Sequence, residues 1–412
     1  MSPAARPGDG RPGGAPSLLR WPAGFALGLA AGAALTVAER RVERRARAAG
    51  LVDWRRVEQV AEARLRRAGG ALEPRELRAV EPDYAASMAR VVPALEAHLG
   101  VPLPGVVERA AVVGRGEWVR ANTAAFAALM GRLEVGLLDG LLPPGAGMAK
   151  SAMALANRWV TTTQMGVLLG FMGQRVLGQY DLALLAAEAA PGRLLFVEEN
   201  IRAVASALDV PVGPFRTWIA LHETTHAYEF EAHPWLRPYL ASRLERQVSM
   251  FGDDAVALGR DAARQATAAL RGEGRHDDRH WLERLMTAEQ RDAFRETQTL
   301  MSLLEGFSDH VMDAVGRELV PGHARISVRF HGRRVRRTPL ERAMLRITGM
   351  DLKLEQYRRG EAFVAAIEGI AGPAALRRLW EGPESLPSPA ELDDPAAWVR
   401  RMRPWGAEGG TA

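Results

Sequence analysis

Residues 222–226 carry the side chains best suited to catalysis. They read His-Glu-Thr-Thr-His and match the H-E-x-x-H pattern, in which two histidines bind zinc and the glutamate acts on water. Histidines four residues apart on one helical face lie about 5–6 Å apart, so both imidazoles can reach one metal. Glu223 lies one residue's rotation away from His222, so it is suited to take a proton from a zinc-bound water rather than to bind the zinc.

The residues around this motif predict a helix with a buried face. Pro214 suits a first helical turn. An apolar stripe at helical spacing then follows, formed by Phe215, Trp218 and Ile219. His222 and His226 continue that stripe, so the metal is expected on the inner side of the helix, shielded from water.

Two histidines need a third ligand, and the nearest histidine does not fit. The pattern H-E-x-x-H-x-x-G-x-x-H fails here, because Glu229 replaces the glycine and Ala232 stands at the third-histidine position. His233 comes one residue late and about 10 Å along the axis from His226. It also precedes Pro234, which disfavours helical geometry, so we expect His233 to mark the end of the helix.

A second segment, residues 298–316, offers a carboxylate ligand. It is strongly apolar, with Leu300, Leu303, Leu304, Phe307, Val311 and Val315 at helical spacings. Glu305 and Asp309 lie four residues apart on it. We predict that Glu305 is the third zinc ligand, because a carboxylate offsets the metal's charge in an apolar setting. Asp309 would orient a ligand histidine through its other ring nitrogen, and His310 and Asp313 are the fallback candidates.

Bulk composition narrows the classes of function. Of the 412 residues, 47% are hydrophobic and 25% are charged, as in soluble globular proteins. The formal charge of +5 comes almost entirely from arginine, with only Lys150 and Lys353 as lysines, and we predict no nucleic-acid partner. The absence of cysteine excludes disulfides, thiol nucleophiles and thiolate zinc sites. Any zinc must therefore be held by His, Asp or Glu.

Periodicity along the chain predicts a mainly α fold with at most a few short strands. Residues 193–201 are the clearest strand, and residues 324–330 alternate like a strand but could also be helical. Residues 156–186 form a long apolar stretch, which its glutamines and threonines favour as a buried helix over a membrane span.

Both ends of the chain differ from the part between them. Residues 1–49 are expected to be a disordered N-terminus containing an uncharged stretch, residues 21–38, that is either a membrane-associated helix or a surface extension. A dense arginine cluster follows that stretch, so a membrane span would leave the main domain inside the cell. We thus expect a cytoplasmic protein, with tethering to the inner face of the membrane as an alternative. Residues 381–412 are predicted to be a loose Pro/Gly-rich tail.

Several segments resemble one protein family. They are GLVDW (50–54), VLGQYDL (176–182), HETTHAYEF, EGFSDHVMDAVG and DLKLEQYRRGEAF (351–363). Together they resemble the type 2 family of zincin-like metallopeptidases, found mostly in actinobacteria, whose members are labelled zinc-dependent metalloproteases, hydrolases or proteins associated with deazaflavin-coenzyme biosynthesis. The resemblance implies one helical zincin-like domain over residues 50–380, with His222, His226 and Glu223 in the usual positions.

Two functions remain open at the level of sequence. The first is a zinc-dependent metallopeptidase-like hydrolase, in which Glu223 activates a zinc-bound water against a peptide or amide carbonyl. The second is a catalytically silent, zinc-stabilised binding or scaffold protein. The retained Glu223 favours the enzyme, since a purely structural metal does not need it. The sequence does not distinguish among possible helper residues, which are Tyr228, His323, His331, Tyr357 and Arg358.

Overall fold

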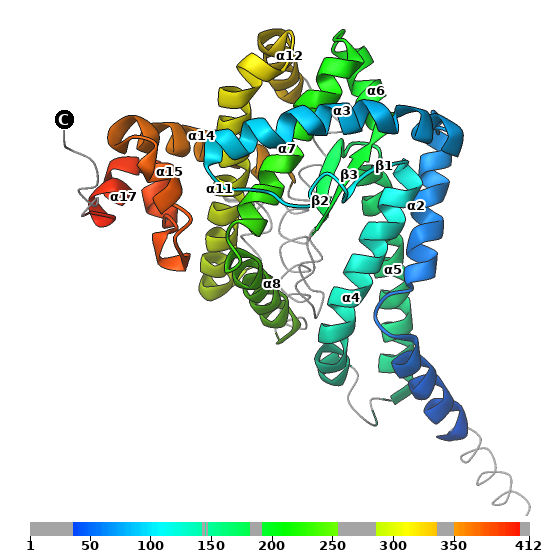
Figure 1. Cartoon of the computed structure of the whole chain (residues 1–412). Helices are drawn as coiled ribbons and strands as arrows, with labels where there is room; N and C mark the ends of the chain where they lie inside the picture. The colour runs from blue at the N-terminus through cyan, green and yellow to red at the C-terminus, as the bar shows by residue number, and fades with distance from the viewer. Residues whose placement is uncertain are drawn as a thin grey trace, which may run out of the picture.

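The computed structural model describes residues 36–141, 145, 147–181, 192–253, 286–335 and 350–403. These residues are mostly helical and contain one small sheet, which confirms the mainly α fold (Figure 1). The longer helices are α2 (Trp54–Ala68), α3 (Pro74–Leu99), α4 (Arg115–Leu141), α5 (Gly147–Gly173), α6 (Glu198–Ala207), α7 (Val212–Glu231), α8 (Leu236–Asp253), α11 (Ala288–Leu319), α12 (His323–Val335) and α14 (Met350–Ala371). Residues 36–49 form a further helix before α2.

The sheet has three strands in the order β1–β3–β2: β1 (Ala110–Val113), β3 (Arg193–Val197) and β2 (Gly178–Asp181). Strand β1 runs parallel to β3, and β2 runs antiparallel to it. The strand predicted at residues 193–201 is therefore shorter than expected, because Glu198 begins α6 directly after Val197. A buried ion pair between Glu198 and Arg216 of α7 stabilises this change of direction. Residues 324–330 lie within α12, so the helical alternative is correct there.

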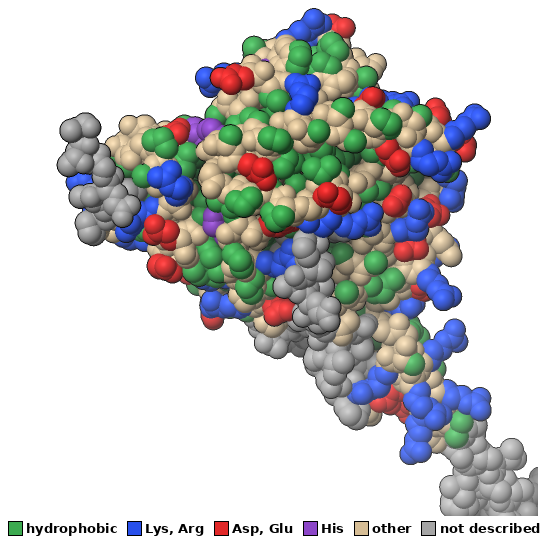
Figure 2. Space-filling model, in the orientation of Figure 1, with side chains coloured by type: hydrophobic (Ala, Val, Ile, Leu, Met, Phe, Trp, Pro, Cys, Tyr) green, Lys and Arg blue, Asp and Glu red, His purple; other side chains and the backbone are tan. Residues whose placement is uncertain are grey.

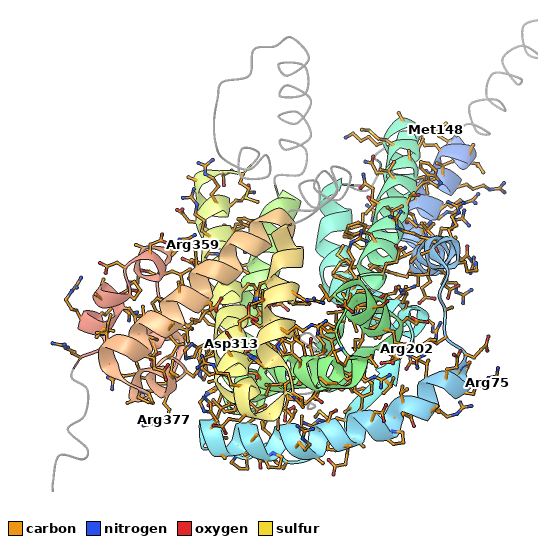
Figure 3. The ribbon with its side chains drawn as sticks, turned by 90° about the horizontal axis from the view of Figure 1, so that it is seen from above. Arg75, Met148, Arg202, Asp313, Arg359 and Arg377 are labelled. Atoms are coloured by element: carbon orange, nitrogen blue, oxygen red, sulfur yellow. The ribbon has the colours of Figure 1, made fainter. Side chains whose placement is uncertain are left out.

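The largest core surrounds α7, which packs against α3 on one side and α11 on the other. Helix α11 in turn packs closely along α14, and Figure 3 shows the two helices crossing. Gly306 of α11 and Gly360 of α14 make this approach possible, because a Cβ atom at either position would collide with backbone of the other helix. The packing of α14 on α11 thereby fixes the helix that carries Glu305.

A second, smaller core lies on the other side of the sheet, where α2, α4 and α5 pack together (Figure 1). The C-terminal half of α5 is buried against α2, with Gly166 and Gly170 facing Val57, Val60 and Ala61 at distances that leave no room for a Cβ atom. This part of the long apolar stretch is therefore a packed helix, as predicted.

The N-terminal expectation lies largely outside the described residues, since only residues 36–38 of the uncharged stretch are among them. Among the helices that the structure describes, none combines the length and the apolar character required for a bilayer span.

The expected loose tail is ordered as far as Arg403. After α15 (Ala374–Arg378) the chain forms η1 (Pro383–Ser385), α16 (Pro389–Asp393) and α17 (Pro395–Arg401). A proline begins each of these short elements, and Ser388 caps α16 with a capping box. The prolines that predicted a loose tail therefore lie at the first positions of short helices. Trp398 is fully buried and donates a hydrogen bond from Nε1 to the Ser385 carbonyl at 2.7 Å.

We predict that Gly360→Ala destabilises the protein by about 1–3 kcal/mol, because the added methyl group must push apart the backbones of α11 and α14. Gly369→Ala is a control on the same helix, since a Cβ atom there meets nothing within 4 Å. That variant should be neutral or stabilise by up to about 1 kcal/mol. Urea unfolding of both variants measures the difference. Equal stabilities would contradict the close contact.

Candidate metal centre

Helix α7 presents the motif as the sequence predicts. It runs from Val212 to Glu231, and its stripe of Phe215, Trp218 and Ile219 is buried in the core. The helix ends before His233, which confirms the expected end. His222 and His226 are each 16% exposed, and their ring centroids lie 4.8 Å apart. Both imidazoles therefore lie side by side and are mostly buried.

Glu305 of α11 faces both histidines. Its Oε2 atom lies 3.7 Å from Nε2 of His222 and 3.7 Å from Nε2 of His226. The ligand atoms of the three residues all lie within 4.8 Å of one another, and they form the one such metal-compatible group found among the described residues. The structure thus brings together the three residues that the sequence singled out as ligands.

The geometry and chemistry of this trio fit a zinc ion. Tetrahedral zinc with ligand bonds of about 2.0–2.1 Å places its ligand atoms about 3.4 Å apart, close to the observed 3.7 Å. Two imidazole nitrogens and one carboxylate oxygen are donors that zinc accepts readily. Nδ1 of His222 is buried without a hydrogen-bond partner, and the other ring nitrogen, Nε2, is the one directed at Glu305.

Asp309 lies behind His222, one turn after Glu305. Its Oδ1 atom is 3.7 Å from Nδ1 of His222, beyond hydrogen-bond range but on the side of the ring away from Glu305. Asp309 is 2% exposed. The role of orienting His222 therefore stays a prediction, since this structure shows no hydrogen bond between the two side chains.

Sequence reasoning missed the acid behind His226. Nδ1 of His226 lies 2.8 Å from Oε2 of Glu229 and 3.1 Å from the Ser308 hydroxyl, and that hydroxyl also donates to Oε1 of Glu229 at 3.2 Å. Glu229 is fully buried. The sequence signal for this contact is the spacing, because side chains three residues apart on a helix lie next to each other, and Glu229 follows His226 by three. The sequence motif by itself marks Glu229 only as the residue at the glycine position.

These buried acids change the proton affinity of the site. Burial alone would lower the pKa of His226, but the carboxylates of Glu229 and Glu305 outweigh it and hold that pKa well above 6.5. Burial raises the pKa of Glu229 from 4.5 to about 7, with His226 opposing the rise. The His226–Glu229 pair therefore retains a proton near neutral pH.

Glu223 lies between the histidines and the edge of the sheet. Its Oε2 atom accepts a hydrogen bond from the backbone N–H of Tyr180 in β2 at 3.1 Å. Gly178 of β2 leaves room for this carboxylate, because a Cβ atom there would lie 2.5 Å from Cγ of Glu223. Burial raises the pKa of Glu223 above its ordinary value of 4.5. The carboxylate is thus fixed in position and more basic than an exposed one.

The remaining candidates have other partners. His233 bonds through Nδ1 to the Glu229 carbonyl at 2.8 Å and stacks on Trp380, and it is not part of the trio. His310 pairs with Glu368 at 2.8 Å, and Asp313 lies 3.3 Å from His323.

Of the helper residues, Tyr228 stacks on Phe307, and Nδ1 of His331 lies 2.8 Å from the Ser327 carbonyl. The side chains of Tyr357 and Arg358 lie outside the described part of the chain.

Two comparisons with known proteins found similarity to this chain. A family model described as zincin-like metallopeptidase matches residues 52–399. A crystal structure from Chloroflexus aurantiacus, described as "a putative hydrolase with a novel fold", is similar at 35% sequence identity and a TM-score of 0.61. That match covers 85% of this chain and 98% of the other. No curated protein matches.

We predict that Glu305→Ala weakens zinc binding by more than a hundredfold, whereas His233→Ala leaves it unchanged, because a Glu305 oxygen lies 3.7 Å from Nε2 of both histidines and His233 is not part of the trio. Asp309→Asn should lower the zinc affinity by about ten- to a hundredfold, as changes to residues that contact a metal ligand usually do. Competition with a chromophoric chelator measures the three affinities. A large loss for His233→Ala with none for Glu305→Ala would contradict the assignment.

Zinc binding should release protons at neutral pH, because the raised pKa of His226 keeps its imidazole doubly protonated and a metal at Nε2 would displace the proton on that nitrogen. Since the pKa of His226 is raised, protons compete with zinc at neutral pH, and zinc affinity should increase as pH rises through the neutral range. Glu229→Gln removes the acid that raises the pKa of His226 and should lower proton release at pH 7 from roughly one per zinc. Calorimetry in buffers of different ionisation enthalpy counts the protons. Equal proton release by the two proteins would exclude this coupling.

Proposed function

Because the chain belongs to the zincin-like metallopeptidase family, we propose that it is a zinc-dependent hydrolase of peptide or other amide bonds. The observation that supports this most directly is the convergence of His222, His226 and Glu305 beside a buried, fixed Glu223. Such a centre contains the ligands and the base of a hydrolytic site in one place.

In this proposal the two histidines and Glu305 hold the zinc, and Glu223 handles protons. Zinc held there would supply Lewis acidity to water and to a carbonyl oxygen. Glu223 accepts a proton from the attacking water and returns it to the leaving amine. Its raised pKa, caused by burial, brings it nearer to the pH at which a base of this kind works best.

Two contacts prepare Glu223 for this role. The Tyr180 N–H holds one of its oxygens, so the carboxylate does not rotate away from the histidines. Gly178 allows the backbone of β2 to lie against it and so excludes water from that side. Both contacts come from the edge strand of the sheet, where the backbone can approach closely.

The alternative is a zinc-stabilised scaffold without turnover. Structural zinc sites usually have four protein ligands, whereas catalytic sites have three and an open position. Within the described residues, the metal-compatible group has three members. That number, together with the buried Glu223, favours the hydrolase.

The proposal is tested by Glu223→Gln. We expect both wild type and variant to bind about one zinc per chain by elemental analysis, because Glu223 is not among the three ligands. Hydrolysis of a peptide library should fall by about a hundredfold or more in the variant. Glu318→Gln, an exposed change on α11, should keep full activity as a control. If wild type and Glu223→Gln hold zinc and are equally inert, the scaffold reading is correct.

A further inference from the structure

The N-terminal half of α5 exposes a continuous apolar face, which we call the α5 face. It consists of Met148, Ala149, Ala152, Met153, Ala156, Trp159 and Val160, all of them exposed. At 100° per residue these seven positions fall within an arc of about 140°. Trp159 is 67% exposed and Met153 is 65% exposed. Large apolar side chains gathered in this way usually mark a contact surface.

The helix of residues 36–49 lies along this half of α5 and contributes positive charge. Its two acids are directed at the start of α5: Glu39 accepts from the Met148 N–H at 3.1 Å, and Glu43 accepts from the Gly145 N–H at 2.8 Å. Arg158 of α5 bonds back to the Ala49 carbonyl at 3.0 Å. The arginines that remain exposed on the helix are Arg40, Arg41, Arg44 and Arg45.

The apolar and basic residues occupy one end of the molecule. Figure 1 shows the helix of residues 36–49 and the start of α5 at its lower right, away from α7 and α11. Figure 2 shows Lys and Arg side chains gathered at this end. In Figure 3, Met148 lies at the same end, beside that helix. This surface is thus separate from the metal centre and independent of the proposed hydrolase activity.

We propose that the α5 face and the adjoining arginines bind the surface of an anionic lipid bilayer. Amphipathic helices that lie on membranes place Trp and other apolar side chains at the headgroup boundary, with basic residues against lipid phosphates. In sequence, the uncharged stretch of residues 21–38 comes directly before these arginines.

The charge pattern favours a bilayer over other occupants. A second copy of the same surface would bring two arginine clusters together, which is unfavourable. A nucleic acid would satisfy the arginines, but its phosphate backbone would leave Trp159 and Met153 in contact with water. An anionic bilayer has both an acidic surface and an apolar interior, so it complements both parts.

The absence of cysteine allows a direct test with the full chain. Met153→Cys carries the only thiol and can be labelled with an environment-sensitive fluorophore. Vesicles of phosphatidylcholine with a quarter of phosphatidylglycerol should shift its emission to the blue, because the label leaves water. The same label at Val328→Cys, 72% exposed on α12, should not respond.

The contribution of the arginines is tested separately. Arg44→Gln combined with Arg45→Gln should weaken binding to the anionic vesicles about 30-fold, at roughly a factor of five per arginine near the surface. The pair Arg75→Gln and Arg78→Gln, exposed on α3, should leave binding unchanged as a matched control.

Three outcomes would overturn the proposal. An unshifted label at position 153 in protein that sediments with vesicles would mean that residues 21–38 bind alone. Equal binding by the two double variants would exclude a role for the arginines on the helix of residues 36–49. A blue shift that grows with protein concentration in the absence of vesicles would identify a second copy of the chain as the occupant.

Discussion

The contact between α7 and α11 encloses more acid than base, and the cost of burying that charge governs the site. Four carboxylates surround two imidazoles there: Glu223, Glu229, Glu305 and Asp309. Moving an ionised carboxylate out of water costs much free energy, unless a proton or a cation compensates its charge. The raised pKa values of Glu229 and His226 show that protons provide part of this compensation. A divalent cation between the histidines and Glu305 would compensate more completely, so charge balance and metal binding are two aspects of one constraint.

The rest of the fold maintains that contact. The close approach of Gly306 and Gly360 holds α14 against α11, so Glu305 keeps its distance from the histidines. On the other side, β2 reaches Glu223 through the Tyr180 N–H. The buried pair of Glu198 and Arg216 ties the end of β3 to α7 itself. Each of these contacts joins segments far apart in sequence, and together they leave the polar groups of the site little freedom to move.

The sequence predicted the helix of the metal motif, because apolar spacing and proline placement are local signals. It also indicated which acid would face the histidines, since Glu305 stood on a strongly apolar helix. It did not indicate the role of Glu229, whose contact with His226 becomes meaningful only when Ser308 of α11 lies against both. The end of β3 at Val197 and the short helices after Gly382 differ from the sequence predictions for a similar reason. Buried partners such as Arg216 and Ser385 decide those structures, and no local pattern records them.

The order in which these parts leave the ribosome has a consequence for the living cell. Beyond α7, Trp235 donates from Nε1 to the carbonyl of Trp380 at 2.9 Å, and Trp380 also packs against Phe307 of α11. Because the ribosome makes the chain from its N-terminus, His222 and His226 are synthesised well before Glu305 and before Trp380, which packs against α11. A nascent chain therefore carries two of the three predicted ligands until α11 has been translated. The candidate metal centre can therefore assemble only late in biosynthesis, after its two distant parts of the chain have both been made.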